Sequence, residues 1–305
     1  MNDYLLQTYL AYLRDERRRA VKTVKVFGAA VRAFLSAGHP IDADGVRAFL
    51  RSLTQNRPKT VALKLSALKS FARWLHDDAG LLSDGEEARV LKLRAPHVPK
   101  SLPRVLSPQE SARLLDYDHP TEHARRLYQI RELRDQALLE LYYGAGVRVG
   151  EAVGLDLDDV CEVVRGKKKF LLLTVLGKGS KERRVPAGRK ARTAFLRFLG
   201  CRAELAALCG PLDPKAIFVG IAKGRRISTR EGYEAVRRRA QATGIYKAHP
   251  HAFRHSYATD LLDGGADLVV VRDLLGHDNL STTSEYLHTS AGKLLAVYGK
   301  CHPRA

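Results

Sequence analysis

The sequence predicts a mainly α-helical protein with one small antiparallel β-sheet, an α+β fold that is divided into two domains. Over most of the 305 residues, apolar side chains recur three and four positions apart, which is the period of amphipathic helices. Short β-rich runs occur only between Val160 and Pro186, with basic turns between them. A cationic stretch with three prolines separates two helical regions, and this composition is typical of an extended linker.

Residues 1–92 are expected to form the first domain. The apolar periodicity places four helices between Asp3 and about Gly80, within residues 4–13, 24–35, 46–53 and 61–75. Four cations are expected to share the polar side of the last of these helices, where they could follow DNA phosphates or simply be solvated: Lys59, Lys64, Lys69 and Arg73.

The second domain is expected at residues 107–290, after a linker at 93–106 and before a C-terminal tail helix within 291–305. Its first helix is predicted to begin after Ser107. The serine is followed by a proline and then, at the third position, by a glutamate, which is the pattern of a helix capping box.

The remaining elements of the second domain are predicted from the helical spacing of apolar residues and from the short β-rich runs. Three strands are predicted at Glu162–Val164, Phe170–Leu176 and Arg183–Val185, joined by turns rich in glycine and lysine. Helices are predicted in this order: one that includes 134–141 and stops at Gly144, then 149–155, 191–208, 229–243, 251–263, 268–275, 282–288, and 291 to about 300.

Composition indicates a polyanionic partner. The chain has 52 Lys and Arg against 33 Asp and Glu, a net charge of +19, and nucleic acid is the commonest partner of such an excess. A basic protein with solvated faces is the alternative. There is no apolar run long enough for a membrane helix and no signal-peptide pattern, so a cytoplasmic, nucleoid-associated protein is expected. The four cysteines lack zinc-ribbon or disulfide spacing.

The second domain combines cationic side chains with a tyrosine, a set that suits attack on a phosphodiester. Positioned cations stabilise the extra negative charge of the transition state, and the phenol can hold the cleaved end covalently. The candidates are Arg148, Lys178, His251, Arg254, His277 and Tyr286. Each one alone has an ordinary alternative, such as a surface turn, a helix end or a packing residue. Glu151 could orient Arg148 or form a simple intrahelical ion pair.

Taken together, four segments resemble the ordered motifs of the tyrosine recombinases: residues 141–151, 177–183, 251–259, and 274–277 with 282–286. The ending His302-Pro303-Arg304-Ala305 resembles the Xer-type members. The resemblance implies a helical SAM-like core-binding domain followed by a tyrosine-recombinase catalytic domain. It also implies duplex DNA with a specific recombination site, a homo- or hetero-tetramer of protomers on two sites, and no cofactor or metal.

The resemblance further implies a role for each candidate. Arg148 and Arg254 would clamp the scissile phosphate, Lys178 would protonate the 5′-oxygen leaving group, and Tyr286 would form a 3′-phosphotyrosine. His251 would assist proton transfer at the nucleophile, and His277 would donate to a non-bridging oxygen. Lys181 and Arg183 are expected at the DNA backbone or in solvent, and His255 is expected to be packed or to support the site.

Several alternatives stay open from the sequence. The Xer-like ending favours resolution of chromosome or plasmid dimers over phage or transposon integration. A relaxing topoisomerase and a non-catalytic architectural DNA-binding protein are alternatives from other classes. A zinc site at His249, His251 and His255 is conceivable. Residues around 165–169 exceed the usual family length, which leaves the strand register open. The tail helix could pack on its own domain, but the resemblance favours docking on a neighbouring protomer.

Overall fold

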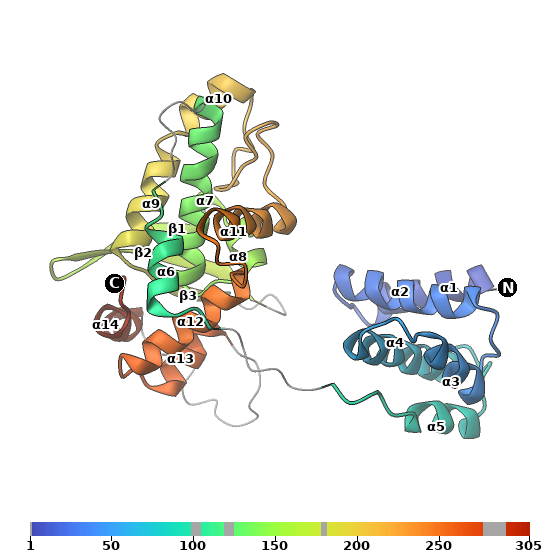
Figure 1. The fold of residues 1–305 in the computed structure, drawn as a ribbon. Helices are drawn as coiled ribbons and strands as arrows, with labels where there is room; N and C mark the ends of the chain where they lie inside the picture. The colour runs from blue at the N-terminus through green and yellow to red at the C-terminus, as the bar shows by residue number, and fades with distance from the viewer. Residues whose placement is uncertain (1, 99–104, 119–124, 178–181, 277–290) are drawn as a thin grey trace. The chain divides into compact units, whose positions relative to one another are not determined.

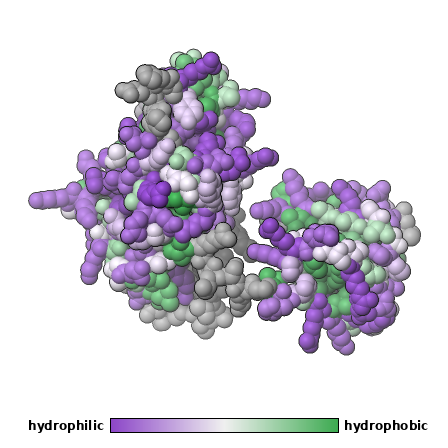
Figure 2. Space-filling view, viewed as in Figure 1, coloured by the Kyte–Doolittle hydropathy of each residue, from purple (hydrophilic) through white to green (hydrophobic). Residues whose placement is uncertain are grey.

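The computed structural model describes residues 2–98, 105–118, 125–177, 182–276 and 291–305 (Figure 1). The chain divides into two compact units, Met1–Ser101 and Leu102–Ala305, and each unit has its own buried core. Hydrophilic side chains cover most of the face of each unit that Figure 2 shows. Within the described ranges, no helix is both long enough and apolar enough to span a membrane.

The first unit is all helical. Its helices are α1 (Asn2–Ala11), which runs on into a π-helical turn at Tyr12–Glu16, α2 (Val21–Ser36), α3 (Ala43–Ser52), α4 (Pro58–Asp77) and α5 (Asp84–Lys92). The four expected helices are therefore confirmed, and α5 is an addition. Only Val90 of α5 is buried, so its apolar period is too weak to predict a helix. Local capping forms it instead, because the Ser83 side chain accepts from the Glu86 N–H.

The second unit opens with a short segment without regular secondary structure, followed by α6 (Pro108–Leu115). The backbone N–H of Leu106 donates to the Ser256 hydroxyl at 2.8 Å, so this residue already belongs to the second unit. The expected capping box is confirmed: the Ser107 hydroxyl accepts from the Glu110 N–H, and the Glu110 carboxylate accepts from the Ser107 N–H. Two helices follow, α7 (Arg126–Gly144) and α8 (Val149–Gly154).

The predicted antiparallel sheet is confirmed. Its strands β1 (Val160–Arg165), β2 (Lys168–Leu176) and β3 (Glu182–Ala187) lie in the order β1-β2-β3. Arg165 pairs with Lys168, so Gly166 and Lys167 form a two-residue turn in which Gly166 has a φ of +59°. This turn decides the register that the sequence left open.

Helices complete the second unit. They are α9 (Arg189–Leu199), α10 (Arg202–Cys209), α11 (Thr229–Thr243), α12 (Pro250–Asp263), α13 (Leu268–Leu275) and α14 (Ala291–Cys301). The bounds of α11 and α13 are as predicted, whereas the single helix predicted at 191–208 is wrong. The chain breaks at Gly200 because Arg202 anchors the next helix to a distant loop by donating to the carbonyls of Asp213, Ala216 and Ile217. The helix predicted at 282–288 lies outside the described residues.

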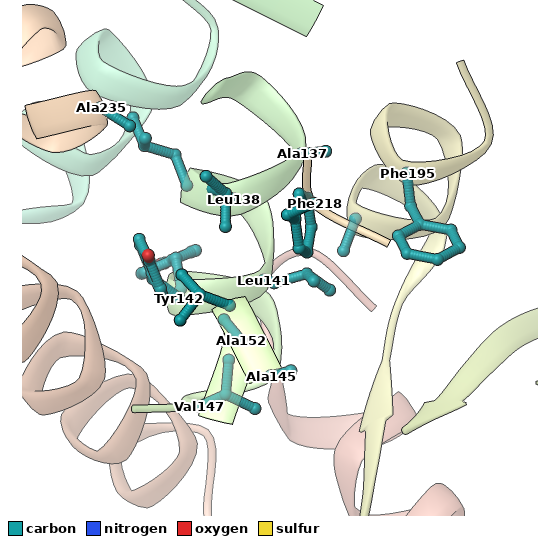
Figure 3. Close-up of a cluster of buried hydrophobic side chains, with 14 of the residues drawn as sticks. Ala137, Leu138, Leu141, Tyr142, Ala145, Val147, Ala152, Phe195, Phe218 and Ala235 are labelled. Carbon is teal, nitrogen blue, oxygen red and sulfur yellow. The ribbon is translucent and has the colours of Figure 1, made fainter. Parts of the chain in front are cut away.

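Helix α7 is central to the core of the second unit. Its side chains Leu138, Leu141 and Tyr142 are fully buried, and they belong to one buried cluster that also includes Phe195 of α9 and Ala235 of α11 (Figure 3). The last turns of α7 are buried through to Gly144. The loop that follows α7 therefore starts from a helix end that is packed in the core.

The tail helix α14 packs within its own unit. Leu294, Leu295 and Tyr298 are buried with residues of β2, α12 and α13, and the Tyr298 hydroxyl accepts from the Gly188 N–H at 2.9 Å. The Arg304 guanidinium binds the carboxylates of Glu140 and Asp116. Within this one chain, α14 therefore packs on its own unit, and docking of the tail helix on a neighbouring protomer stays a prediction.

Candidate active site

The loop between α7 and α8 positions the first arginine of the site. Gly146 in this loop has a φ of +60°, and a Cβ there would lie 2.4 Å from the ring of Tyr257. Only glycine fits both this backbone conformation and this packing. The loop delivers Arg148 to the N-cap position of α8, where its N–H donates to the Glu151 carboxylate at 2.8 Å.

Glu151 lies between two guanidinium groups. Arg148 Nη1 donates to its carboxylate at 2.7 Å, and the two terminal nitrogens of Arg183 donate to its two oxygens at 2.9 and 2.8 Å. Burial raises the pKa of Glu151, but hydrogen bonds from Arg183 and Arg148 outweigh burial and lower the pKa to about 2. The carboxylate is therefore ionised at neutral pH and holds the head of Arg148 in one orientation.

Arg254 reaches the same place from α12. His249 caps this helix by accepting from the Ala252 N–H at 3.0 Å, and Pro250 occupies its first turn. Arg254 is only 6% exposed, and its Nη1 donates to the Gly146 carbonyl at 2.5 Å. Burial and the nearby positive charge of Arg148 lower the pKa of Arg254 to about 10, so it stays protonated at neutral pH.

Three arginines meet at the C-terminal end of α13. The three consecutive carbonyls at residues 274–276, here called the α13 carbonyl triplet, have no partners within the helix and need donors from elsewhere. Gly276 ends the helix in the left-handed conformation, with a φ of +63°. Each carbonyl accepts from a different guanidinium: Leu274 from Arg183 at 3.1 Å, Leu275 from Arg254, and Gly276 from Arg148 at 3.2 Å.

This arrangement suits an anion with several oxygens. Three guanidinium groups face one carboxylate, which leaves an excess of two positive charges before any ligand binds. Guanidinium groups present planar pairs of donors that match phosphate oxygens. Because the groups already converge on one place, a phosphate there could replace their carbonyl partners without moving the helices that carry them.

The structure brings together some of the predicted site residues. Arg148, Glu151 and Arg254 form one cluster. His251 lies in the first turn of α12, where it is exposed and its ring lies 6.4 Å from that of His249. Four further candidates lie outside the described residues: Lys178, Lys181, His277 and Tyr286.

The cations of α4 are arranged differently from the expected shared face. Lys59 and Arg73 are exposed, as expected. Lys64 is half-buried with its ammonium 5.5 Å from the centre of the Phe49 ring, and Lys69 donates to the Leu91 carbonyl at 2.6 Å. The expectation of four equivalent exposed cations is therefore corrected, because neighbouring helices cover two of them.

Sequence reasoning missed the place of Arg183, which it assigned to the DNA backbone or solvent. The structure puts Arg183 against Glu151 and α13. The alternation of side chains along a strand could have predicted this position. Successive residues point to opposite faces, so Arg183 shares the face of Val185 and Ala187, which are both fully buried. His255 is exposed and not packed. In the described part of the chain, no group of three or more metal-ligating side chains occurs.

Comparison with known proteins places the chain among recombinases. Residues 104–293 match the Phage integrase family, and residues 6–78 match the Phage integrase, N-terminal SAM-like domain. The chain is 36% identical to the tyrosine recombinase XerC of Syntrophus aciditrophicus (strain SB), over 99% of this chain and 98% of that protein. It is also 36% identical to XerC of Salmonella typhi, over 97% and 95% of the two chains.

Solved structures share the fold. The XerH site-specific recombinase bound to difH substrate, in a pre-cleavage complex, has a TM-score of 0.65 at 20% identity and covers 97% of this chain and 83% of its own. Lambda integrase bound to DNA has a TM-score of 0.62 at 17% identity and covers 93% and 94%. Together with the family matches over both units, these findings confirm the resemblance that the motifs indicated. The chain therefore belongs to the phage integrase family of tyrosine recombinases, enzymes that cleave and rejoin DNA.

Proposed function

We propose that this recombinase resolves chromosome or plasmid dimers by site-specific recombination in the cytoplasm. Its XerC relatives, at 36% identity over nearly the whole chain, support this choice among the activities of the family. The substrate is duplex DNA that carries a specific site. Two such sites would be held together by a tetramer of recombinase protomers, either four copies of this chain or two copies with a related partner.

One observation carries the assignment of the phosphate site: Arg148 and Arg254 converge from different helices on neighbouring carbonyls of the α13 carbonyl triplet. The two guanidinium groups clamp the non-bridging oxygens of the scissile phosphate. Their charge stabilises the transition state more than the substrate, because attack at phosphorus places additional negative charge on these oxygens.

The remaining candidates complete a transesterification. The Tyr286 hydroxyl attacks phosphorus, so that the bond from Tyr286 Oη to phosphorus forms and the bond from phosphorus to the 5′-oxygen breaks. Lys178 gives a proton to the leaving 5′-oxygen, His251 assists removal of the phenolic proton, and His277 donates to a non-bridging oxygen. The phosphotyrosyl bond retains the energy of the broken strand. The 5′-hydroxyl of another strand can therefore reverse the reaction without ATP.

The first unit supplies sequence-independent affinity. Lys59 and Arg73 are exposed on α4 and can contact phosphates, which fixes the enzyme on the duplex without reading its bases. The chemistry is thus assigned to the second unit, and part of the hold on DNA to the first.

The nucleophile is tested with a suicide substrate, a nicked duplex whose cleavage releases a short strand and traps the protein on DNA. Wild-type protein is expected to form a protease-sensitive covalent adduct, and Tyr286→Phe is expected to bind DNA normally and form none. An adduct trapped by the Phe variant would refute this assignment.

The biological role is tested by sequencing the DNA that remains attached to the wild-type protein. We expect a chromosomal or plasmid site, two direct copies of which convert a plasmid dimer into monomers when the protein is present. Attached DNA that maps instead to the ends of a mobile element would favour integration over dimer resolution.

A further inference from the structure

Arg183 differs from the two other arginines that hold the α13 carbonyl triplet. All three of its side-chain nitrogens donate to protein groups: the two terminal nitrogens to Glu151, and Nε to the Leu274 carbonyl. Only 13% of the Arg183 side chain is exposed, against 34% for Arg148. Arg254 is also buried, but it bonds through its two terminal nitrogens, to the carbonyls of Gly146 and Leu275. Arg183 is therefore enclosed by its protein partners, whereas the Arg148 guanidinium is open to a ligand.

Phosphate binding would change the partners of the other two arginines. Arg148 and Arg254 each use one terminal nitrogen on the α13 carbonyl triplet. A phosphate that takes up these donors competes with the carbonyls of Leu275 and Gly276. The end of a helix carries about half a negative charge, so it is a weaker partner for a guanidinium than a phosphate is.

The bonds of Arg183 do not compete with the phosphate. Its link from β3 to Leu274 would persist while Arg148 and Arg254 turn to the substrate. Its bidentate pair with Glu151 also leaves that carboxylate with a second cation besides Arg148. Without Arg183, the whole charge of Glu151 would act on Arg148 and draw its guanidinium away from the phosphate.

We propose that Arg183 is a positioning residue of the phosphate site. It shares the charge of Glu151 so that Arg148 keeps donors for the substrate, and it anchors the last turn of α13 when phosphate displaces the other two contacts. This proposal rests on the proposed function, because it takes Arg148 and Arg254 as the phosphate-binding pair. It predicts an effect on the rate of cleavage and not on the affinity for DNA.

The test uses full-length protein with Arg183→Gln or Arg183→Lys and a suicide substrate at saturating concentration. We expect R183Q to lower the first-order rate of adduct formation roughly 10- to 100-fold, because a small misplacement of a catalytic group has effects of this size. DNA affinity should stay unchanged. R183K keeps the charge but cannot form the bidentate pair and the Leu274 bond together, so its rate should fall as well.

Arg184→Gln is the matched control. Arg184 is the next residue of β3, is exposed, and points to the opposite face of the strand. Its loss should leave the rate at saturating DNA unchanged. The effect of R183Q should also shrink in a Glu151→Gln background, since part of the role of Arg183 acts through that carboxylate.

The outcomes separate this proposal from the proposed function. Adducts formed at equal rates by wild-type protein and R183Q would overturn the positioning role alone, as would lost affinity with an unchanged rate. No adduct from the wild-type protein would overturn the proposed function and this proposal with it. Thermal unfolding shows whether R183Q is folded; if it is not, R183K decides the question by the same criteria.

Discussion

The exposed cations of the first unit and the buried arginines of the candidate site are held in opposite ways. In the first unit, Arg14 and Asp15 form an ion pair in which the side chains are 66% and 58% exposed. Such pairs add little to stability and are screened by salt. In the second unit, Arg254 is 6% exposed and bonded to two backbone carbonyls. Exposed cations can adapt to a DNA backbone, whereas buried ones are fixed before DNA arrives, which is the condition for electrostatic catalysis.

The largest expected effect tests whether fixed cations do the chemistry. Arg254→Lys should lower the rate of adduct formation by about 100- to 1,000-fold, the usual effect of removing one transition-state donor, because an ammonium lacks the planar fork of a guanidinium. DNA affinity, measured by titration, should change little. Arg202→Lys is the control, since Arg202 also donates to backbone carbonyls but lies outside the cluster. Equal loss of cleavage in both variants would show that the effect is not specific to the arginine cluster.

A second change tests the rigidity of the loop that carries Arg148. Gly146→Ala combines a strained positive φ with a clash against Tyr257, and overpacking of this kind destabilises by about 1–3 kcal/mol beyond the backbone strain. Gly166→Ala, with a similar φ but open space around it, should show the strain alone. Urea unfolding of both variants measures the difference. If the two are equally destabilised, then the Tyr257 contact does not restrict the loop.

A third change uses pH to show that Glu151 is held as an anion. Its pKa falls from 4.5 to about 2 on folding, so the carboxylate adds stability above about pH 4.5 and loses that contribution as pH falls toward 2. The contribution is about 3 kcal/mol. Glu151→Gln should therefore be less stable than wild type at neutral pH, and the gap in unfolding free energy should narrow in acid. Glu162→Gln should show a much smaller gap, because the Glu162 side chain is 43% exposed in its ion pair with Arg192.

The smallest effect concerns the first unit. Lys59→Gln should reduce the salt dependence of DNA affinity by about one unit of log affinity per log salt, as expected for one lost phosphate contact. Lys69→Gln should reduce it less, because Lys69 is already bonded to the Leu91 carbonyl. Neither should alter cleavage at saturating DNA. Equal changes in the salt slope would show that the bond to Leu91 breaks when DNA binds.

Local signals in the sequence predicted much of the fold. The bounds of α11 and α13, the capping box at Ser107 and the hairpin order of the sheet follow from contiguous residues, because periodicity, caps and turns act over a few positions. The same reasoning missed α5 and joined α9 to α10. The apolar spacing does not predict α5, which a side-chain cap stabilises, or the break before α10, where Arg202 donates to a carbonyl 14 residues away.

The candidate site likewise has residues that the sequence predicted and contacts that it did not. The sequence by itself identified the family motifs and singled out Arg148, Glu151 and Arg254, since the types and spacing of these residues are local properties. Only the tertiary structure decided that Arg183 pairs with Glu151, 32 residues away, and that three arginines share the end of α13. Such pairings depend on which buried surfaces pack together, and that packing brings charges from separate elements within hydrogen-bonding distance.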